Sequence, residues 1–354
     1  MAPILQFGTI SFILVLALGI PVAMLAERCG IIDVPGSAPH KQHARTTPLA
    51  GGILVFITLS FLAVIFSSSL NRQIVAVLSG TFIIFLFGLV DDIKGLSAGP
   101  KLIGQLIAST ILISFDVQVR FVTVLFDTGV FAPMLVELLN VLITLFWLVG
   151  ITNAMNMIDS MDGIVAGLGI IVSLFFIGAT NLSDQPVLAR WASGILGVSI
   201  GLYFWNGVVV RFFLGDSGAQ TLGFFLASLG ILYNPLNRNP ESSWIVPIML
   251  LGVPIFDTTL VVLSRFRRKQ PIGTGRRDHT YHRLIRLGMS PRLAVLSVHL
   301  MALVFSSLAL LTLYLKSWIA LLFFIGAILI GVNLLFWLER QPTLDDAVEQ
   351  QIKD

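Results

Sequence analysis

Long apolar runs separated by short polar segments make up most of this 354-residue chain. Eleven of these runs reach the length of roughly 17–25 residues that an α-helix needs to cross a lipid bilayer. We therefore expect an all-α integral membrane protein with ten or eleven transmembrane helices. The number of spans is ten or eleven because the fourth run is short. In addition, only Lys316 and Ser317 separate the tenth run from the eleventh. The expected spans cover residues 4–26, 49–69, 73–90, 100–115, 131–153, 163–181, 187–205, 217–234, 244–264, 293–315 and 317–338.

No internal repeat or low-complexity segment divides the chain, so residues 1–340 are expected to form one transmembrane domain. The first apolar run has no basic segment before it and is long enough to span, which favours a retained helix over a cleaved signal peptide. Residues 341–354 are expected to form a short polar tail. A hydrophobic content of 56% excludes an ordinary soluble core, and the single cysteine, Cys29, excludes an internal disulfide.

The positions of Lys and Arg predict the orientation, because basic residues gather in cytoplasmic loops. With eleven spans, seventeen basic residues lie on the face that carries the C-terminus and five lie on the other. We therefore expect a multi-pass protein of the cytoplasmic membrane, with the N-terminus outside and the C-terminus inside. The same topology places five carboxylates on the cytoplasmic face, each at the edge of an apolar run: Asp91, Asp92, Asp159, Asp162 and Asp216.

Carboxylates at the end of a membrane helix are costly, and neighbouring ones repel unless a cation lies between them. Asp and Asn oxygens suit a hard cation such as Mg²⁺, which keeps several waters and often bridges phosphate oxygens. The segment from Asn153 to Asp162 has a polar residue at every third position, which keeps these side chains near one face of a helix. We expect this segment to line a cleft, the alternative being an ordinary polar loop.

Two further segments suggest anion binding. Residues 213–218 are typical of a glycine-containing loop that enters a helix, where backbone amides favour an anion. Asp216 in this loop could also serve only as a helix cap. The segment 265–292 holds nine basic residues together with His279 and His282. These groups could clamp a diphosphate, although they also enforce the topology. A cation site beside a basic loop suggests chemistry on an anionic nucleotide with a lipid partner.

These motifs resemble those of the polyprenyl-phosphate N-acetylhexosamine-1-phosphate transferases (glycosyltransferase family 4). This family includes phospho-MurNAc-pentapeptide translocase and the UDP-GlcNAc:undecaprenyl-phosphate GlcNAc-1-phosphate transferases. The resemblance runs from about residue 46 to residue 286. Any one motif is weak, but six occur in order on the predicted cytoplasmic side: Thr47–Gly52, Asp91-Asp92, Asn153–Gly163, Phe213–Gly218, Pro254–Thr258 and the loop with His279 and His282.

The resemblance implies a role for each matched residue. It implies that Asp216 and Asn156 are ligands of Mg²⁺, for which Mn²⁺ is an alternative. It implies that Asp91 and Asp92 deprotonate or position the polyprenyl phosphate, and that Lys101 contacts phosphate groups. Asn153 is expected to contact substrate, and Asp159 and Asp162 match residues that contact the nucleoside. Phe213 matches an aromatic residue that stacks on the uracil. The diphosphate and the sugar are held, by the same resemblance, by His279, His282 and Arg283.

By this resemblance, the lipid phosphate attacks the β-phosphorus of a UDP-sugar, UMP leaves, and a polyprenyl-diphosphate sugar remains in the bilayer. This step begins the synthesis of a lipid-linked cell-envelope glycan. Ser160 stands where many relatives have glycine, and Tyr281 where bacterial relatives often carry a third histidine. The loop also lacks the adjacent histidines of the MurNAc-pentapeptide branch, so UDP-GlcNAc is the expected donor and phospho-MurNAc-pentapeptide transfer the alternative. A homodimer is implied, and no nucleic-acid partner is expected.

Two other classes of membrane protein compete with this interpretation. A cation transporter would hold its acids near the midplane between two similar halves, whereas these acids gather at one interface. A CDP-alcohol phosphotransferase would be smaller and would concentrate its aspartates in one motif, of which Asp159 and Asp162 reproduce only a fragment. Asp257 follows Pro254 inside an expected span. It is expected either to make a structural hydrogen bond at a helix break or to join the site.

Overall fold

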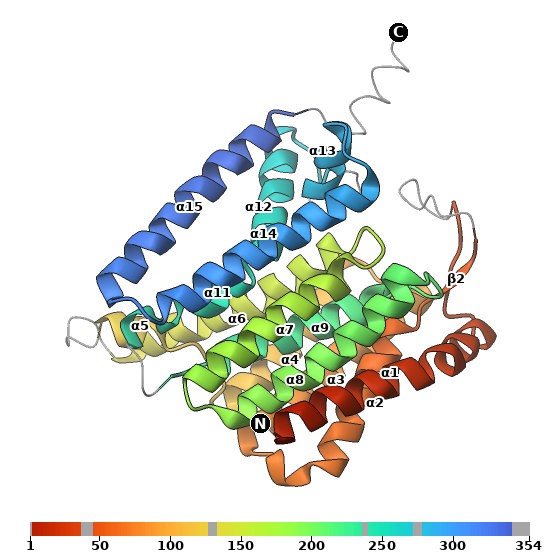
Figure 1. Cartoon of the computed structure of the whole chain (residues 1–354), viewed down its shortest axis with the longest axis horizontal. Helices are drawn as coiled ribbons and strands as arrows, with labels where there is room; N and C mark the ends of the chain where they lie inside the picture. Colours follow the sequence, from red (N-terminus) through yellow and green to blue (C-terminus); the bar gives the residue numbers. More distant parts are fainter. Residues whose placement is uncertain (1, 37–44, 127–132, 236–239, 272–277, 342–354) are drawn as a thin grey trace.

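The computed structural model describes residues 2–36, 45–126, 133–235, 240–271 and 278–341, and these form a bundle of helices with one small pair of strands (Figure 1). The strands β1 (Ile32–Asp33) and β2 (Thr47–Pro48) pair in antiparallel orientation. The helices are α1 (Ala2–Arg28), α2 (Gly51–Ile65), the 3-10 helix η1 (Ser67–Ser69), α3 (Arg72–Lys94), α4 (Ala98–Ser114), α5 (Phe121–Phe126), α6 (Pro133–Ile158), α7 (Ile164–Leu182), α8 (Pro186–Leu202), the π-helix η2 (Tyr203–Val208), α9 (Gly215–Leu232), α10 (Pro240–Ser243), α11 (Ile245–Leu250), α12 (Gly252–Arg267), α13 (Thr280–Arg286), α14 (Pro291–Thr312) and α15 (Ser317–Glu339).

Seven of the described helical segments are long and apolar enough to cross a membrane: α1, α3, α6, α7, α8 with η2, α14 and α15. Helices α2 and α4 are apolar but shorter, and α9 is buried from Ser217 to Gly230. The expected all-α membrane architecture is therefore confirmed. The number of eleven spans and the orientation of the termini stay predictions. The expected polar tail lies outside the described residues from residue 342 onward.

Each expected span contains a helix, but the span expected over 244–264 is not one continuous helix. Helix α11 ends at Leu250 and α12 begins at Gly252. Pro254 has no N–H to donate to the carbonyl of Leu250, so the helical hydrogen-bond ladder is interrupted at this point. The break matters for the site because α12, which begins after it, carries Asp257.

The buried helix α9 forms the centre of the bundle and contacts α2, α3 and α6. Helix α1 packs along α8, where Gly197 allows a close approach: a Cβ at this position would lie 2.0 Å from the carbonyl oxygen of Gly8. Such small residues are typical of helix pairs in membranes. Helices α1 and α15 lie at opposite edges of the bundle in Figure 1. The described core thus surrounds α9, whose first turn lies in the candidate site.

Candidate active site

The predicted acidic motifs converge where α9 begins. Asp91 and Asp92 lie in the last turns of α3, and Asp216 lies in the first turn of α9. Asn156 lies near the end of α6, and Asp159 follows that helix. Three segments that are far apart in the sequence therefore contribute to one polar cluster. The contacts below show which of their side chains meet.

Lys101 supplies the positive charge that adjacent carboxylates require. Its Nζ lies 2.7 Å from Oδ2 of Asp216 and also forms an ion pair with Asp91. Asn156 Nδ2 donates to the same Asp216 oxygen at 3.4 Å, and the Leu96 N–H donates to Oδ1 of Asp91 at 2.5 Å. The structure thus brings together four of the predicted residues: Asp91, Lys101, Asn156 and Asp216.

Asp92 has a different set of partners, because it binds the start of α9. Its Oδ1 accepts a hydrogen bond from the Asp216 N–H at 2.7 Å, and its Oδ2 accepts one from the Ser217 N–H at 3.2 Å and another from the Ser217 hydroxyl. Leu214, at the N-cap position of α9, has no capping side chain. A carboxylate from α3 therefore satisfies the amides that open α9, and it favours the positive end of the helix dipole.

Three glycines allow this close approach of α2, α3 and α9. A Cβ at Gly52 would lie 2.1 Å from Oγ of Ser217, and one at Gly88 would lie 2.5 Å from the Cα of Ser217. Gly215 has φ +72, and a Cβ there would lie 2.6 Å from an oxygen of Asp92. At these positions a side chain would displace the backbone that carries Asp216.

The Thr47–Gly52 motif lies directly against the loop that precedes α9. The Phe213 N–H donates to the carbonyl oxygen of Pro48 at 2.9 Å, and the Ala50 N–H donates to the carbonyl oxygen of Phe213 at 3.2 Å. Leu49 and Phe213 form an isolated parallel bridge. This pairing explains why the two motifs occur together. The phenylalanine side chain itself is half-buried.

The loop between α6 and α7 carries Asp159 and Asp162 and is tied to the Phe213 loop by Asn206. The Gly163 N–H donates to Oδ1 of Asn206 at 2.8 Å, and Asn206 Nδ2 donates to the carbonyl oxygen of Phe212 at 3.3 Å. Asn206 lies on the π-helix η2, a feature that is frequent at functional sites. The sequence analysis missed Asn206, because a single asparagine at the end of an apolar run resembles ordinary helix packing.

Asp159 experiences an excess of negative charge. Burial, together with the charges of Asp216, Asp162 and Asp92, raises the pKa of Asp159 well above its usual value. Asp159 therefore lies within the electric field of three other carboxylates, one of which, Asp216, is in contact with Lys101.

Asn153 makes a side-chain network one turn before Asn156 on α6. Its Nδ2 donates to Gln105 Oε1 at 2.7 Å, and Gln105 Nε2 donates to Asn153 Oδ1 at 3.1 Å and to Gln220 Oε1 at 3.1 Å. These amides join α4, α6 and α9 beneath the carboxylates. The expected substrate contact of Asn153 stays a prediction, and the described contacts give it a role in holding the helices together.

The histidine loop begins with a buried contact to α12. Asp257 is fully buried, and its Oδ2 lies 2.8 Å from Nδ1 of His279, while its Oδ1 accepts a hydrogen bond from the Thr280 N–H at 2.7 Å. Tyr281 donates its hydroxyl to the carbonyl oxygen of Ser160 at 2.8 Å and lies 2.6 Å from Nε2 of His282. Helix α13 therefore rests against the loop that carries Asp159 and Asp162.

The guanidinium of Arg283 has several partners within the protein, and its expected contact with the diphosphate and sugar stays a prediction. Its guanidinium is fully buried and donates to the Asp278 carbonyl and the Ser264 hydroxyl. It also donates to three carbonyl groups at the end of α15, those of Leu338, Glu339 and Gln341. These bonds occupy the guanidinium, so in this arrangement Arg283 joins α13 to α15. Two other basic residues of the loop, Arg276 and Arg277, lie outside the described residues.

The donor set fits a magnesium ion better than a metal that needs a full protein cage. Among the described residues, no three His, Cys, Asp or Glu side chains form a metal-binding group. Mg²⁺ usually takes one or two carboxylates and fills its remaining positions with waters and substrate phosphates. The carboxylate oxygens of Asp216 and the amide oxygen of Asn156 are ligands of this kind, and the two side chains are in contact through Nδ2 of Asn156.

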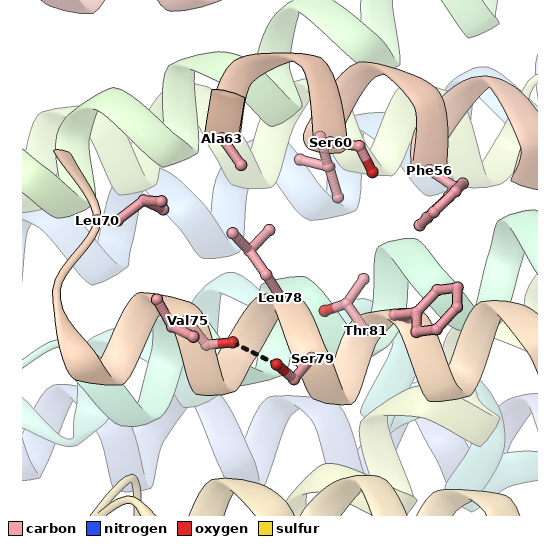
Figure 2. Close-up of a pocket in the computed structure, with 10 residues that line it drawn as sticks. Phe56, Ser60, Ala63, Leu70, Val75, Leu78, Ser79 and Thr81 are labelled. Carbon is pink, nitrogen blue, oxygen red and sulfur yellow. Dashed lines mark hydrogen bonds between the residues drawn. The ribbon is translucent and has the colours of Figure 1, made fainter. Parts of the chain in front are cut away.

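A groove lies apart from these residues, between α2 and α3 (Figure 2). Its volume is about 350 Å³. Its lining contains none of the candidate site residues and is mainly apolar: Phe56, Leu59, Ser60, Ala63, Leu70, Val75, Leu78, Ser79, Thr81 and Phe82.

The fold and the site define a class of helical membrane protein in which carboxylates and a lysine meet at the start of one buried helix. Comparison with known proteins shows that this class is a family of membrane transferases. The chain belongs to this class as a member of glycosyl transferase family 4, whose family model matches residues 74–234. The matched segment includes Asp91, Lys101, Asn156 and Asp216. The protein is accordingly a multi-pass membrane protein of a transferase family.

Three relatives show the range of named activities in the family. The chain is 33% identical to a probable undecaprenyl-phosphate N-acetylglucosaminyl 1-phosphate transferase of Bacillus subtilis, over 88% of this chain and 86% of that protein. It is 31% identical to the decaprenyl-phosphate N-acetylglucosaminephosphotransferase of Mycobacterium tuberculosis, over 79% of this chain and 75% of that protein. It is 28% identical to a phospho-N-acetylmuramoyl-pentapeptide-transferase of Streptococcus pneumoniae, over 73% and 79%.

Proposed function

We propose that this protein transfers N-acetylglucosamine 1-phosphate from UDP-GlcNAc to a polyprenyl phosphate such as undecaprenyl phosphate, with release of UMP. The observation that carries the proposal is the convergence of Asp91, Lys101, Asn156 and Asp216 at the start of α9. The names of the Bacillus and Mycobacterium relatives support the donor and the acceptor class. The active site faces the cytoplasm, where UDP-sugars are made, and the product begins a cell-envelope glycan.

The residues of the cluster divide between the two substrates. Asp216 and Asn156 would hold Mg²⁺, which when bound neutralises charge on the sugar diphosphate and on the leaving UMP. Lys101 adds a second positive charge for a phosphate group. Asp91 holds Lys101 and is the carboxylate that accepts a proton from the lipid phosphate. Asp92 keeps the Asp216 backbone in position through its hydrogen bonds to α9.

The bond changes follow from this arrangement. An oxygen of the lipid phosphate attacks the β-phosphorus of UDP-GlcNAc, and a new P–O–P bond forms. The bond between the β-phosphorus and the oxygen that bridges to the α-phosphorus breaks. UMP leaves with that oxygen, and the polyprenyl diphosphate carries the sugar. Catalysis of this kind depends on positioning and on charge neutralisation, which is what clustered carboxylates, a cation and a lysine provide.

The alternative donor is UDP-MurNAc-pentapeptide, because a named relative in Streptococcus pneumoniae is a phospho-N-acetylmuramoyl-pentapeptide-transferase. The two donors share the uridine diphosphate and differ in the group on the sugar. Competition between them in one reaction therefore distinguishes the two functions without any change to the protein.

Purified protein supplied with Mg²⁺, undecaprenyl phosphate and UDP-GlcNAc is expected to release UMP, and EDTA is expected to stop the release. Asp216→Ala is expected to abolish release while the protein keeps its thermal midpoint within a few degrees. Asp116→Ala is a matched control, because Asp116 is an exposed aspartate paired with Arg120 outside the cluster. Absence of UMP release with every UDP-sugar tested, in the presence of intact acceptor, would contradict the proposal.

A further inference from the structure

Asp257 is a buried carboxylate outside the acidic cluster that the proposed mechanism uses. It lies on α12, three residues after the proline that follows the break between α11 and α12. Its side chain is fully buried and both of its oxygens have partners on the histidine loop, Nδ1 of His279 at 2.8 Å and the Thr280 N–H at 2.7 Å. A buried carboxylate is costly unless its bonds are needed, so both contacts require an explanation.

The contact with His279 determines which ring nitrogen carries a proton. A carboxylate oxygen accepts hydrogen bonds, so Nδ1 of His279 is the protonated nitrogen that donates to Asp257. The ring is then held with Nε2 on its opposite side. Within the described part of the chain, no side chain or backbone group bonds to Nε2 of His279. Nε2 of His279 is therefore available to a ligand that binds at the histidine loop.

The position of α13 shows which part of the protein lies next to His279. Tyr281 bonds to the carbonyl of Ser160, and Ser160 is adjacent to Asp159, whose charge interacts with Asp216 and Asp92. The rings of His279 and His282 lie 5.8 Å apart between centroids. Helix α13 therefore holds two imidazoles beside the loop that carries Asp159.

We propose that Asp257 is a positioning residue for the transfer reaction, which holds His279 in the Nδ1–H form so that the unprotonated Nε2 accepts a hydrogen bond from a hydroxyl or amide N–H on the sugar of the donor. This inference rests on the proposed function, since it takes the sugar of the UDP-sugar donor as the partner of Nε2. It goes beyond the acidic cluster because it assigns a role to a carboxylate that contacts no substrate itself. Carboxylates that orient a functional histidine are a general device in proteins.

A purely structural role for Asp257 makes different predictions. The bond to the Thr280 N–H only caps α13, and an asparagine at 257 retains an oxygen that accepts this bond. The bond to His279 is changed by the same substitution, because the asparagine Nδ2 donates and favours the opposite tautomer, with the proton on Nε2. Asp257→Asn therefore separates the two roles within one side chain of nearly constant size.

The test measures UMP release for Asp257→Asn, His279→Ala and the double variant, with the thermal midpoint of each. Asp257→Asn is expected to lower kcat by about 10²-fold with a small change in KM for the donor. The thermal midpoint is expected to stay within a few degrees of wild type. In the His279→Ala background, Asp257→Asn is expected to cause little further loss, because a residue that acts through another adds nothing once that residue is removed.

A second measurement does not depend on activity. Nitrogen-15 NMR of histidine-labelled protein is expected to show the Nδ1–H form for His279, with the signal assigned by its loss in His279→Gln. The Nε2–H form is expected in Asp257→Asn. Wild-type-like kcat in Asp257→Asn, an equal loss in both backgrounds, or an Nε2–H tautomer in wild type would each overturn the proposal. A wild-type protein that releases no UMP from any donor would instead contradict the proposed function, and the NMR result would still decide the arrangement of Asp257 and His279.

Discussion

At the residue scale, Asp91 and Asp92 are adjacent in the sequence but bind different partners. Successive side chains on an α-helix point about 100° apart, so the two carboxylates leave α3 in different directions. Asp91 meets Lys101, whereas Asp92 meets the backbone of α9. The sequence predicts that both lie in the site, but their spacing does not separate their roles. The structure assigns Asp91 to the charged cluster and Asp92 to the support of Asp216.

Asp92→Asn tests this division. An asparagine accepts with one oxygen only, so at least one of the amides of Asp216 and Ser217 loses its charged acceptor. Loss of such a cap costs about 1–2 kcal/mol, and it also moves the backbone that carries Asp216. We therefore expect Asp92→Asn to lower both the thermal midpoint and the rate of UMP release. Asp91→Asn is expected to lower the rate with a smaller effect on the midpoint. Equal midpoints for Asp92→Asn and wild type in detergent would contradict the capping role.

The ion pair between Arg265 and Asp278 predicts a dependence of stability on pH. Arg265 Nε and Nη2 donate to the two oxygens of Asp278 at 2.8 and 2.9 Å in a buried setting. Burial alone would raise the pKa of Asp278, but the hydrogen bonds and charge of Arg265 outweigh it and hold the pKa below its usual value. A carboxyl group with a lowered pKa stabilises the fold above the unfolded value of about 3.9, and this contribution is lost as the pH falls through the folded value.

Asp278→Asn removes the charge of one partner and leaves Arg265 buried without it, which costs about 3–5 kcal/mol. The variant is therefore expected to unfold at a lower temperature than wild type at pH 7. The difference is expected to shrink as the pH falls below about 4, because the Asp278 carboxyl of the unfolded wild-type chain becomes protonated there, and to keep shrinking until the folded carboxyl is protonated at a lower pH. Thermal unfolding of both proteins across this pH range is the measurement. A difference that stays constant down to pH 3 would show that the charge of Asp278 contributes little.

At the element scale, the positions of the helices follow from hydropathy, but the irregular features do not. The apolar runs predict a helix in each expected span because a backbone in lipid must satisfy its own hydrogen bonds. The break at Leu251 depends on Pro254, which the sequence shows, but the partners of Asp257 on α12 depend on packing. The role of Arg283 depends on the carbonyl groups at the end of α15, more than fifty residues away. Local patterns do not encode such partners.

The candidate site shows the same division between local and distant information. The acidic residues and the histidine loop are recognisable because charged groups are rare at the ends of apolar runs. Gln105, Gln220 and Asn206 are missed because a single neutral polar residue in an apolar run resembles ordinary helix packing. Their hydrogen bonds join helices that are distant in the sequence. The network beneath the site is therefore visible only in the folded protein.

The close packing of α3 on α9 predicts that Gly88 does not tolerate a methyl group. A Cβ at Gly88 would lie 2.5 Å from the Cα of Ser217, so the backbone at the start of α9 has to move. Overpacking of this kind costs about 1–3 kcal/mol. Gly88→Ala is therefore expected to lower the thermal midpoint by several degrees and to reduce UMP release, because Asp216 precedes Ser217.

Gly150→Ala is the matched control for Gly88→Ala. Gly150 also lies inside a long helix, α6, but a Cβ there would meet no atom within 4 Å. Alanine favours the helix over glycine by about 0.5–1 kcal/mol, so this variant is expected to keep or raise the thermal midpoint and to retain activity. If the two variants lose stability equally, the close contact between Gly88 and Ser217 does not explain the effect.

At the scale of the whole molecule, the C-terminal helix α15 is joined to the active-site side mainly at its last turn. In its apolar window only 11% of the residues are buried, while Glu339 is buried and forms an ion pair with Arg267. Arg283 binds the carbonyl groups of the same turn. The long apolar surface of α15 therefore faces lipid or a second copy of the chain, and the homodimer stays a prediction. The last turn of α15, a helix that otherwise lies at the edge of the bundle, therefore stabilises the position of the histidine loop.

The orientation of the whole chain is testable with its natural cysteine. Cys29 is the single cysteine, is exposed, and follows α1. The backbone joins this end of α1 to the site, because the Leu49 N–H donates to the carbonyl oxygen of Ile31 and Leu49 pairs with Phe213. A reagent that detects the side of Cys29 therefore also detects the side of the acidic cluster.

A membrane-impermeant maleimide is expected to label Cys29 only after the cells are permeabilised. In a Cys29→Ser background, Ser68→Cys is expected to react in intact cells, because exposed Ser68 lies in η1, beyond the opposite end of α2. Helix α1 has 27 residues and a length of about 40 Å, enough to place its two ends on opposite sides of a bilayer. Labelling of Cys29 in intact cells would reverse the predicted topology and place the carboxylates outside. Since UDP-sugars are cytoplasmic, that result would also remove the donor from the proposed reaction.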